Sequence, residues 1–210
     1  MTTANLGDKV AKALLDIKAV ALKPHDPFIW SSGLRSPIYC DNRLTISYPE
    51  IREMIAEGLA ALIQEQYGDV DVIAGAATAG IPHAAWVAQK LNKPMVYVRS
   101  SPKKHGTGSL IEGVLHEGQT VVVIEDLIST GGSSLKVVEG VRQAGGKVLG
   151  VAAIFSYEFE SAVQNFQAAD CPFATLSNYS KLLPIAVQEN YVDEGDLELL
   201  RKWKDAPEKY

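Results

Sequence analysis

The strongest evidence for the fold lies in the stretch Val121-Val122-Val123-Ile124-Glu125-Asp126-Leu127-Ile128-Ser129-Thr130-Gly131-Gly132-Ser133-Ser134. Its four leading β-branched residues predict a strand that is buried on both faces, as in a parallel sheet. The hydroxyl and glycine residues that follow predict a tight turn. A helix is then expected from Ser133 to Ala144, with Gly145-Gly146 closing it. The stretch therefore predicts one strand–turn–helix unit of an α/β protein.

The turn combines two carboxylates with a backbone suited to anions. Small residues from Thr130 to Ser133 let backbone N–H groups approach a phosphate, and the start of a helix adds positive potential. Glu125 and Asp126 would repel a phosphate but suit neutral hydroxyls or a metal-bound group. This combination predicts a ligand shaped like a ribose 5-phosphate. The alternative is a simple glycine turn, but a buried strand would not otherwise end in two acids.

Outward from this stretch the sequence alternates between strands and helices. Strands are predicted at residues 70–74, 95–98 and 147–155; helices are predicted from Leu6 to Val20, from a capping box at Ser47-Tyr48-Pro49-Glu50 to Gly68, and from Pro82 to Leu91. Buried strands that alternate with helices predict an α/β fold with a mainly parallel sheet flanked by helices. Ligands of such sheets bind outside the carboxyl ends of the strands, where the polar loops fall here.

Composition narrows the class of protein. The 210 residues include 20 Lys plus Arg and 25 Asp plus Glu, so the net charge is −5, which argues against indiscriminate binding of nucleic acid. The longest aliphatic run, Val121 to Ile124, is too short to cross a bilayer. Cys40 and Cys171 form no CxxC pair, and residues 1–12 lack the pattern of a signal peptide. We expect a cytoplasmic protein with no membrane or nucleic-acid partner.

The two acids followed by Ser-Thr-Gly-Gly-Ser resemble the phosphoribosyl-pyrophosphate motif of type I phosphoribosyltransferases at every position from Glu125 to Ser133. The resemblance implies that fold in a single domain over residues 1–210, with a core of about 48–176 and a small hood of about 1–47 and 177–210. The resemblance also implies which residues bind phosphoribosyl pyrophosphate. They are Arg99, Lys103, His105, Glu125, Asp126, Leu127, Ile128, Ser129, Thr130, Gly131, Gly132 and Ser133.

A basic segment from Arg99 to Ser109 gives a second resemblance. Its pattern Arg-x-x-x-Lys-x-His-Gly is similar to the catalytic loop of orotate phosphoribosyltransferases, which implies that Arg99, Lys103 and His105 contact pyrophosphate. In that family the loop reaches the neighbouring subunit, so a homodimer with shared active sites is implied. Lys103, His105 and Asp126 are then the catalytic residues. A solvated basic loop is the alternative, and Ser100 departs from the Lys that many relatives carry.

The segment from Phe28 to Arg43 resembles the orotate side of the same family. The resemblance implies that Tyr39, Arg43 and Ser129 contact orotate; a structural Arg and a core Tyr are the alternatives. Residues 75–82 resemble the pyrophosphate loop, with Ala79 where some relatives have Lys. Phe159 stands where some relatives have Arg, so the contacts to the base cannot be transferred as a whole.

These resemblances imply an orotate phosphoribosyltransferase of pyrimidine biosynthesis. The reaction transfers ribose 5-phosphate from phosphoribosyl pyrophosphate to orotate and releases pyrophosphate and orotidine 5′-monophosphate. Mg²⁺ is the expected cofactor, carried mainly by the substrate, and no protein ligand is assigned to it. A phosphoribosyltransferase for another base and a phosphoribosyl-pyrophosphate-sensing regulator on the same fold are the alternatives. The general base stays open.

Overall fold

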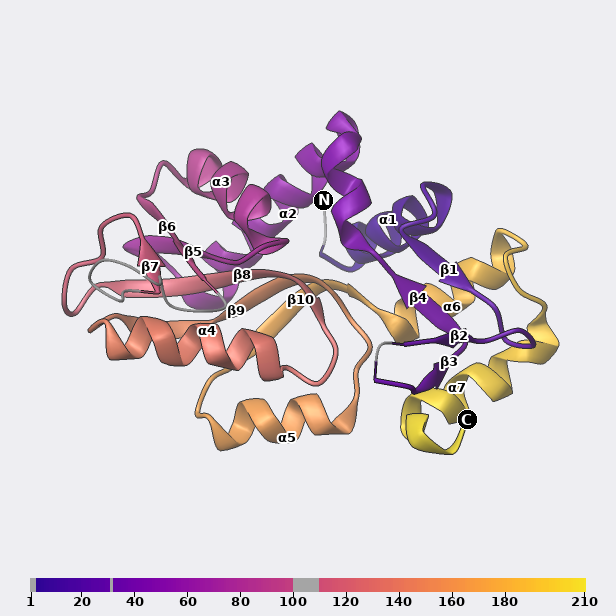
Figure 1. Ribbon diagram of the computed structural model, residues 1–210. Helices are drawn as coiled ribbons and strands as arrows, with labels where there is room; N and C mark the ends of the chain where they lie inside the picture. The colour runs from indigo at the N-terminus through magenta and orange to yellow at the C-terminus, as the bar shows by residue number, and fades with distance from the viewer. Residues whose placement is uncertain (1–2, 31, 100–109) are drawn as a thin grey trace.

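The computed structural model describes residues 3–30, 32–99 and 110–210. A six-stranded sheet with strand order β10-β9-β8-β5-β6-β7 forms its centre (Figure 1). The strands are β5 (Val72–Ala76), β6 (Met95–Val98), β7 (Ile111–Glu112), β8 (Thr120–Ile128), β9 (Lys147–Ser156) and β10 (Phe173–Asn178). Every neighbouring pair is parallel except β6 and β7. The predicted mainly parallel α/β fold is confirmed.

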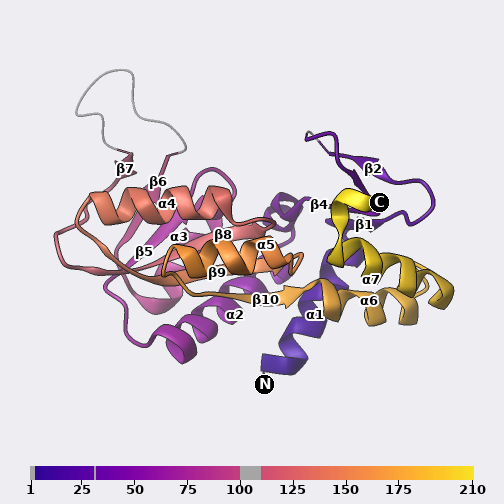
Figure 2. The same cartoon turned by 90° about the horizontal axis from the view of Figure 1, so that it is seen from below.

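Helices cover both faces of the sheet. Helices α2 (Pro49–Tyr67) and α3 (Gly80–Leu91) lie on one face, and α4 (Gly132–Gln143) and α5 (Glu160–Ala168) lie on the other (Figures 1 and 2). Alternate residues of β8 serve the two layers: Val123 packs with the α4 cluster, whereas Val122 packs with the α2 and α3 cluster. Within the described ranges, no helix is long and apolar enough to cross a membrane.

Segments from the N-terminal and C-terminal parts of the chain lie beside the carboxyl ends of β8 and β9 (Figure 1). The elements there are α1 (Thr3–Asp16), β1 (Val20–Leu22), β2 (Phe28–Ile29), β3 (Arg35–Ser36), β4 (Ile38–Cys40), α6 (Tyr179–Gln188), α7 (Leu197–Asp205) and the 3₁₀ helices η1 (Asn42–Ser47), η2 (Glu194–Asp196) and η3 (Pro207–Lys209). Strand β1 pairs with β4, and β2 pairs with β3. The Tyr210 hydroxyl donates a hydrogen bond to the Pro24 carbonyl. We call α1, β1–β4, α6, α7 and these three 3₁₀ helices the hood.

Several predicted boundaries differ from the structure. The predicted capping box at Ser47 is wrong, because Ser47 is the last residue of η1 and α2 instead has Tyr48 at its N-cap, without a side-chain cap, followed by Pro49. The N-terminal helix ends at Asp16, since Val20 instead pairs with Cys40 in a strand. The strand predicted at 70–74 lies at Val72–Ala76, and the helix predicted to start at Pro82 starts at Gly80.

Strand β8 is longer than the sequence pattern predicts. The predicted strand ended at Ile124, but the observed strand continues through both acids to Ile128. This extension exists because Leu127 and Ile128 pair with Phe155 and Ser156 of β9. Glu125 and Asp126 therefore belong to the end of a strand rather than to a loop.

Candidate active site

The turn after β8 requires glycine at one position and leaves open space at the next. Gly131 has a φ of +82°, and a Cβ atom there would lie 2.6 Å from the Phe166 ring. Gly131 therefore combines a left-handed conformation with close packing, and only glycine meets both demands. At Gly132, the first residue of α4, a Cβ atom would have no neighbour within 4 Å. The start of α4 is thus accessible to an anionic ligand.

Glu125 faces α4 and its carboxyl group already has partners. One oxygen accepts a hydrogen bond from the Ser134 hydroxyl at 3.1 Å, and the other accepts one from the Asp126 amide at 3.2 Å. The side chain is only 7% exposed. Burial, together with the charge of Asp126 beside it, raises the pKa of Glu125 to about 8. The site thus disfavours the charged form of Glu125.

Asp126 is connected to the hood. The Asn42 side-chain amide donates a hydrogen bond of 2.7 Å to the Asp126 backbone carbonyl, and the Cys40 thiol donates to the Asn42 side-chain oxygen at 3.3 Å. Burial raises the pKa of the Asp126 carboxyl group. Burial and the Asp126 charge together raise the pKa of the Cys40 thiol. Asn42, which is fully buried, thus fixes the end of β8 against the hood.

A cavity of 470 Å³ lies between the hood and the ends of β8 and β9. We call it the aromatic pocket; it is lined by Ile29, Trp30, Ser32, Tyr39, Cys40, Leu127, Ser129 and Tyr157. The rings of Trp30 and Tyr157 stack, with centroids 5.3 Å apart and an interplanar angle of 28°. The pocket therefore offers flat apolar surfaces to a planar ring.

The structure brings two of the three residues predicted to contact orotate into this pocket. Tyr39 and Ser129 both line it. Arg43 is not among its lining residues, and its guanidinium forms two hydrogen bonds with the Asp41 carboxylate, at 2.6 and 2.9 Å. These bonds lower the pKa of Asp41. Arg43 would have to leave Asp41 in order to bind a substrate carboxylate.

The predicted pyrophosphate contacts are only partly described. Arg99 follows β6 directly, and its guanidinium pairs with Glu112 of β7 at 3.3 Å. Lys103 and His105 lie outside the described residues. The predicted pyrophosphate loop joins β5 to α3; its Ala77 amide donates to the Val98 carbonyl at 3.0 Å, and the Ala77–Thr78 peptide bond is cis.

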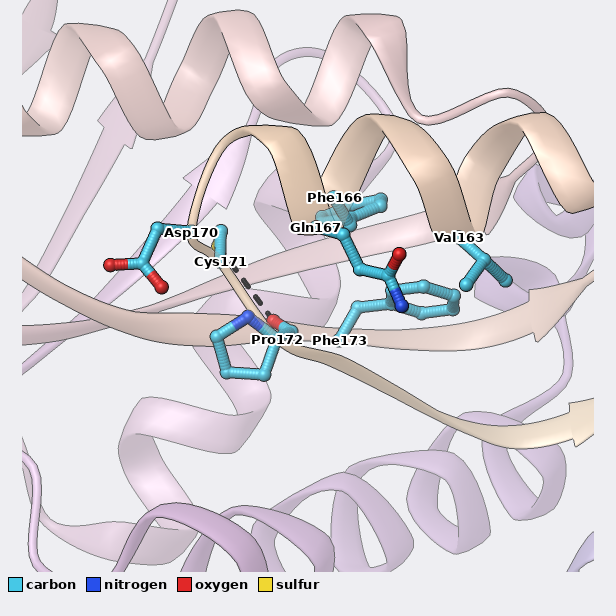
Figure 3. Close-up of a pocket in the computed structure, with 7 residues that line it drawn as sticks. All are labelled: Val163, Phe166, Gln167, Asp170, Cys171, Pro172 and Phe173. Atoms are coloured by element: carbon cyan, nitrogen blue, oxygen red, sulfur yellow. Dashed lines mark hydrogen bonds between the residues drawn. The ribbon is translucent and has the colours of Figure 1, made fainter.

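A second cavity, of 440 Å³, lies between α5 and the start of β10 (Figure 3). Phe166 and Phe173 form much of its wall, with ring centroids 4.5 Å apart. None of the predicted site residues is among the described residues that line it. Its link to the site is structural, because the other side of Phe166 packs against Gly131.

Sequence analysis missed three residues of this region: Trp30, Asn42 and Tyr157. Tyr157 comes directly after β9, which ends at Ser156, so the rule that ligands bind at the carboxyl ends of parallel strands could have identified it. Trp30 and Asn42 lie within the Phe28–Arg43 segment that resembles the orotate side of the family, but the resemblance gave neither of them a role. They reach the site through packing of the hood against strands more than eighty residues away in the sequence.

The sheet and its phosphate-type turn define a phosphoribosyltransferase, and residues 47–172 match the family model described as "Phosphoribosyl transferase domain". The chain belongs to this family.

Its relatives identify the branch of the family. The chain is 55% identical over 202 residues to the orotate phosphoribosyltransferase of Listeria monocytogenes, covering 96% of this chain and 97% of that protein. It is 57% identical over 202 residues to that of Enterococcus faecalis, covering 96% of each. The crystal structure of orotate phosphoribosyltransferase from Aeropyrum pernix superposes with a TM-score of 0.75 at 29% identity, covering 87% of this chain and 99% of that one. Within the family, the chain is thus one of the orotate phosphoribosyltransferases.

Proposed function

We propose that this protein transfers ribose 5-phosphate from phosphoribosyl pyrophosphate to orotate, in the biosynthesis of pyrimidine nucleotides. One observation carries the proposal. The end of β8 separates an open, glycine-containing helix start on one side from the aromatic pocket on the other, with Asp126 between them. A phosphorylated sugar that is attacked by a planar base needs this arrangement: an anion site for its phosphate, a carboxylate near the ribose, and a flat apolar pocket for the base. The names of the relatives support orotate as the base.

The turn from Thr130 to Ser133 would hold the 5-phosphate. The first backbone N–H groups of a helix have no partner within it, a Cβ atom at Gly132 would meet no neighbour within 4 Å, and the helix dipole adds positive potential. The hydroxyls of Thr130 and Ser133 add donors for phosphate oxygens. Anchoring this end of the substrate would fix the anomeric carbon in front of the base.

Asp126 would act on the ribose. During the reaction the bond from the anomeric carbon to the pyrophosphate oxygen breaks, and a bond to a ring nitrogen of orotate forms. The sugar ring gains positive charge in this transition state, and a nearby carboxylate stabilises that charge. The Glu125 carboxyl, which accepts a hydrogen bond from the Ser134 hydroxyl, would also maintain the shape of the turn. Direct contact of Glu125 with the ribose hydroxyls stays a prediction.

Pyrophosphate leaves more easily when its charge is neutralised. Arg99, Lys103 and His105 are the predicted contacts, and removal of one of them should slow turnover on the order of 10²-fold. Lys103→Ala tests this with kcat for orotate consumption, and an unchanged kcat would remove Lys103 from the mechanism.

Mg²⁺ would add to this neutralisation by binding the pyrophosphate oxygens. In the described part of the chain, no group of three or more His, Cys, Asp or Glu side chains could hold a metal ion. Mg²⁺ commonly binds through one or two carboxylates plus substrate phosphates, so Asp126 fits as a single protein ligand beside a substrate-borne ion. Activity should therefore depend on Mg²⁺ added together with phosphoribosyl pyrophosphate.

The homodimer with shared active sites stays a prediction, and mixing two inactive variants tests it. Asp126→Asn disables the site, and Lys103→Ala disables the loop that would reach the partner. If sites are shared, mixed dimers contain one site with both native residues, so subunit exchange should restore about a quarter of the native activity. No recovery after confirmed exchange would show that each subunit works with its own loop. The single-domain organisation and the cytoplasmic location also stay predictions.

The decisive experiment is a substrate assay. Purified protein is incubated with phosphoribosyl pyrophosphate, with and without Mg²⁺, and with orotate, uracil, hypoxanthine or adenine in parallel. We expect loss of orotate and release of pyrophosphate only when both substrates and Mg²⁺ are present. Preferred use of a purine would indicate a different phosphoribosyltransferase. Binding of phosphoribosyl pyrophosphate with no turnover of any base would favour the sensing regulator.

A further inference from the structure

Tyr157 carries a polar group into an otherwise apolar aromatic cluster. The residue is 3% exposed; its ring stacks on Trp30 and makes edge contacts with Phe155, at 6.1 Å, and Trp203, at 5.9 Å. Phe155 and Phe159 belong to the same cluster without a hydroxyl. A buried hydroxyl lowers stability unless it finds a hydrogen-bond partner, so packing alone favours Phe at this position.

The Tyr157 hydroxyl has no hydrogen-bond partner among residues 3–30, 32–99 and 110–210. The hydrogen bond that Tyr157 does form comes from its backbone amide, which donates to the Ile128 carbonyl. The hydroxyl also differs from the fully enclosed polar side-chain atoms that lack partners in these ranges, which are His83 Nδ1, Ser177 Oγ and Trp203 Nε1. Tyr157 lines the aromatic pocket, and its oxygen is not one of these fully enclosed atoms. A ligand in the pocket can supply the missing partner.

The surroundings keep this hydroxyl a proton donor. Burial, followed by the charges of Cys40, Tyr39 and Asp126, raises the pKa of Tyr157 far above its usual range. The other polar groups of the pocket are partly engaged: the Cys40 thiol donates to Asn42, and the Ser32 hydroxyl accepts from the Leu34 amide. Tyr157 is therefore the deeply buried, unpartnered donor of the pocket.

We propose that the Tyr157 hydroxyl selects the base by donating a hydrogen bond to an exocyclic oxygen of the pyrimidine. Trp30, which stacks on the Tyr157 ring, holds that ring in position. The inference rests on the proposed function, because it assigns the base to the aromatic pocket. Pyrimidine carbonyl and carboxylate oxygens accept such a bond. Adenine has no exocyclic oxygen, so it cannot accept this bond and forgoes the affinity that the bond contributes.

Tyr157→Phe tests the proposal because it removes one oxygen and keeps the ring. Loss of a hydrogen bond to an anionic ligand should raise the KM for orotate about 10- to 100-fold, and the Kd measured by calorimetry should rise by the same factor. The KM for phosphoribosyl pyrophosphate should stay within about twofold, since no phosphate contact changes. The melting temperature should stay the same or rise.

Tyr179→Phe is the matched control in the same cluster. The Tyr179 ring contacts Trp203 at 5.4 Å, and its hydroxyl donates to the Leu200 carbonyl at 3.2 Å. This variant should lower the melting temperature and leave the KM for orotate unchanged, which is the opposite of the result expected for Tyr157→Phe. An unchanged orotate KM in Tyr157→Phe, or a loss of stability with both KM values raised equally, would overturn the inference. If the native protein consumes no orotate, the proposed function itself fails.

Discussion

The α4 side and the hood side of the end of β8 differ in how completely their polar groups are satisfied. On the α4 side, both oxygens of Glu125 accept hydrogen bonds from the protein. On the hood side, the Tyr157 hydroxyl has no partner in the described residues, and the aromatic pocket opens beside Asp126. The comparison teaches that one side maintains the shape of the site and the other side leaves its polar groups to a ligand.

Asp126→Asn should have the largest effect, because it changes the hood side where the sugar would react. We expect kcat/KM for orotate to fall on the order of 10²- to 10³-fold, since a charge that stabilises the transition state is lost. Stability should change little, because burial already disfavours the charged carboxylate. Glu125→Gln is the comparison and should lower kcat/KM about tenfold or less. Equal losses in the two variants would contradict the distinction between the two sides.

Gly132→Ala should have the next largest effect, and it tests the α4 side alone. The added methyl group has no protein neighbour within 4 Å, so the melting temperature should not fall. If the 5-phosphate lies there, the methyl group should raise the KM for phosphoribosyl pyrophosphate about tenfold.

Gly131→Ala is the matched control for that prediction. Its Cβ atom would approach the Phe166 ring to 2.6 Å at a φ of +82°, so the expected result is a loss of stability of about 1–3 kcal/mol. Thermal unfolding and steady-state kinetics of both variants separate strain from binding. An unchanged KM in Gly132→Ala would place the phosphate elsewhere.

Asn42→Ala should have a moderate effect that reaches both sides. It removes the 2.7 Å hydrogen bond to the part-buried Asp126 carbonyl and empties a fully buried position. We expect the free energy of unfolding to fall by about 1–3 kcal/mol and kcat to fall severalfold, with urea unfolding and kinetics as the measurements. Ser177→Ala, which removes a buried hydroxyl without a partner, is the control and should be neutral. A normal kcat in Asn42→Ala would show that the hood does not position Asp126.

Glu125→Gln should have the smallest effect on turnover, but it should change how stability depends on pH. The folded pKa of about 8 lies above the unfolded value near 4.5, so the folded state binds the proton more tightly. The contribution of Glu125 to the free energy of unfolding is therefore complete below pH 4.5 and is lost as the pH rises toward 8. The variant lacks this loss, so its free energy of unfolding relative to the native protein should rise between pH 5 and pH 9. If the free energy of unfolding changed with pH in the same way in the variant and in the native protein, the raised pKa of Glu125 would be contradicted.

The central fold was predictable because its signals are local. The Val121–Ile124 run, the glycine turn and the helix after it correctly indicated a buried strand and α4. Strand β7, with two residues, and the hood strands, with two or three each, are too short for a hydrophobic period to reveal.

The candidate site was predictable only in part. The motif located Glu125 and Asp126, but the strand that carries them depends on the extension of β8 to Ile128, which pairing with β9 causes. Burial and the interaction between these two neighbouring carboxyl groups, which raise the pKa of Glu125, likewise follow from the tertiary structure. The contact of Trp30 with Tyr157 arises from tertiary packing, and no local pattern encodes it.

The hood is built from segments on both flanks of the sequence, and the hydrogen bond between Tyr210 and Pro24 connects them. The turn predicted to bind the phosphate lies between these flanks. Mutation and recombination can therefore remodel the flanks while the sugar-phosphate machinery is inherited intact. Such modularity offers evolution a route to new base preferences within one scaffold. It also offers protein engineers a natural boundary at which to graft a different hood.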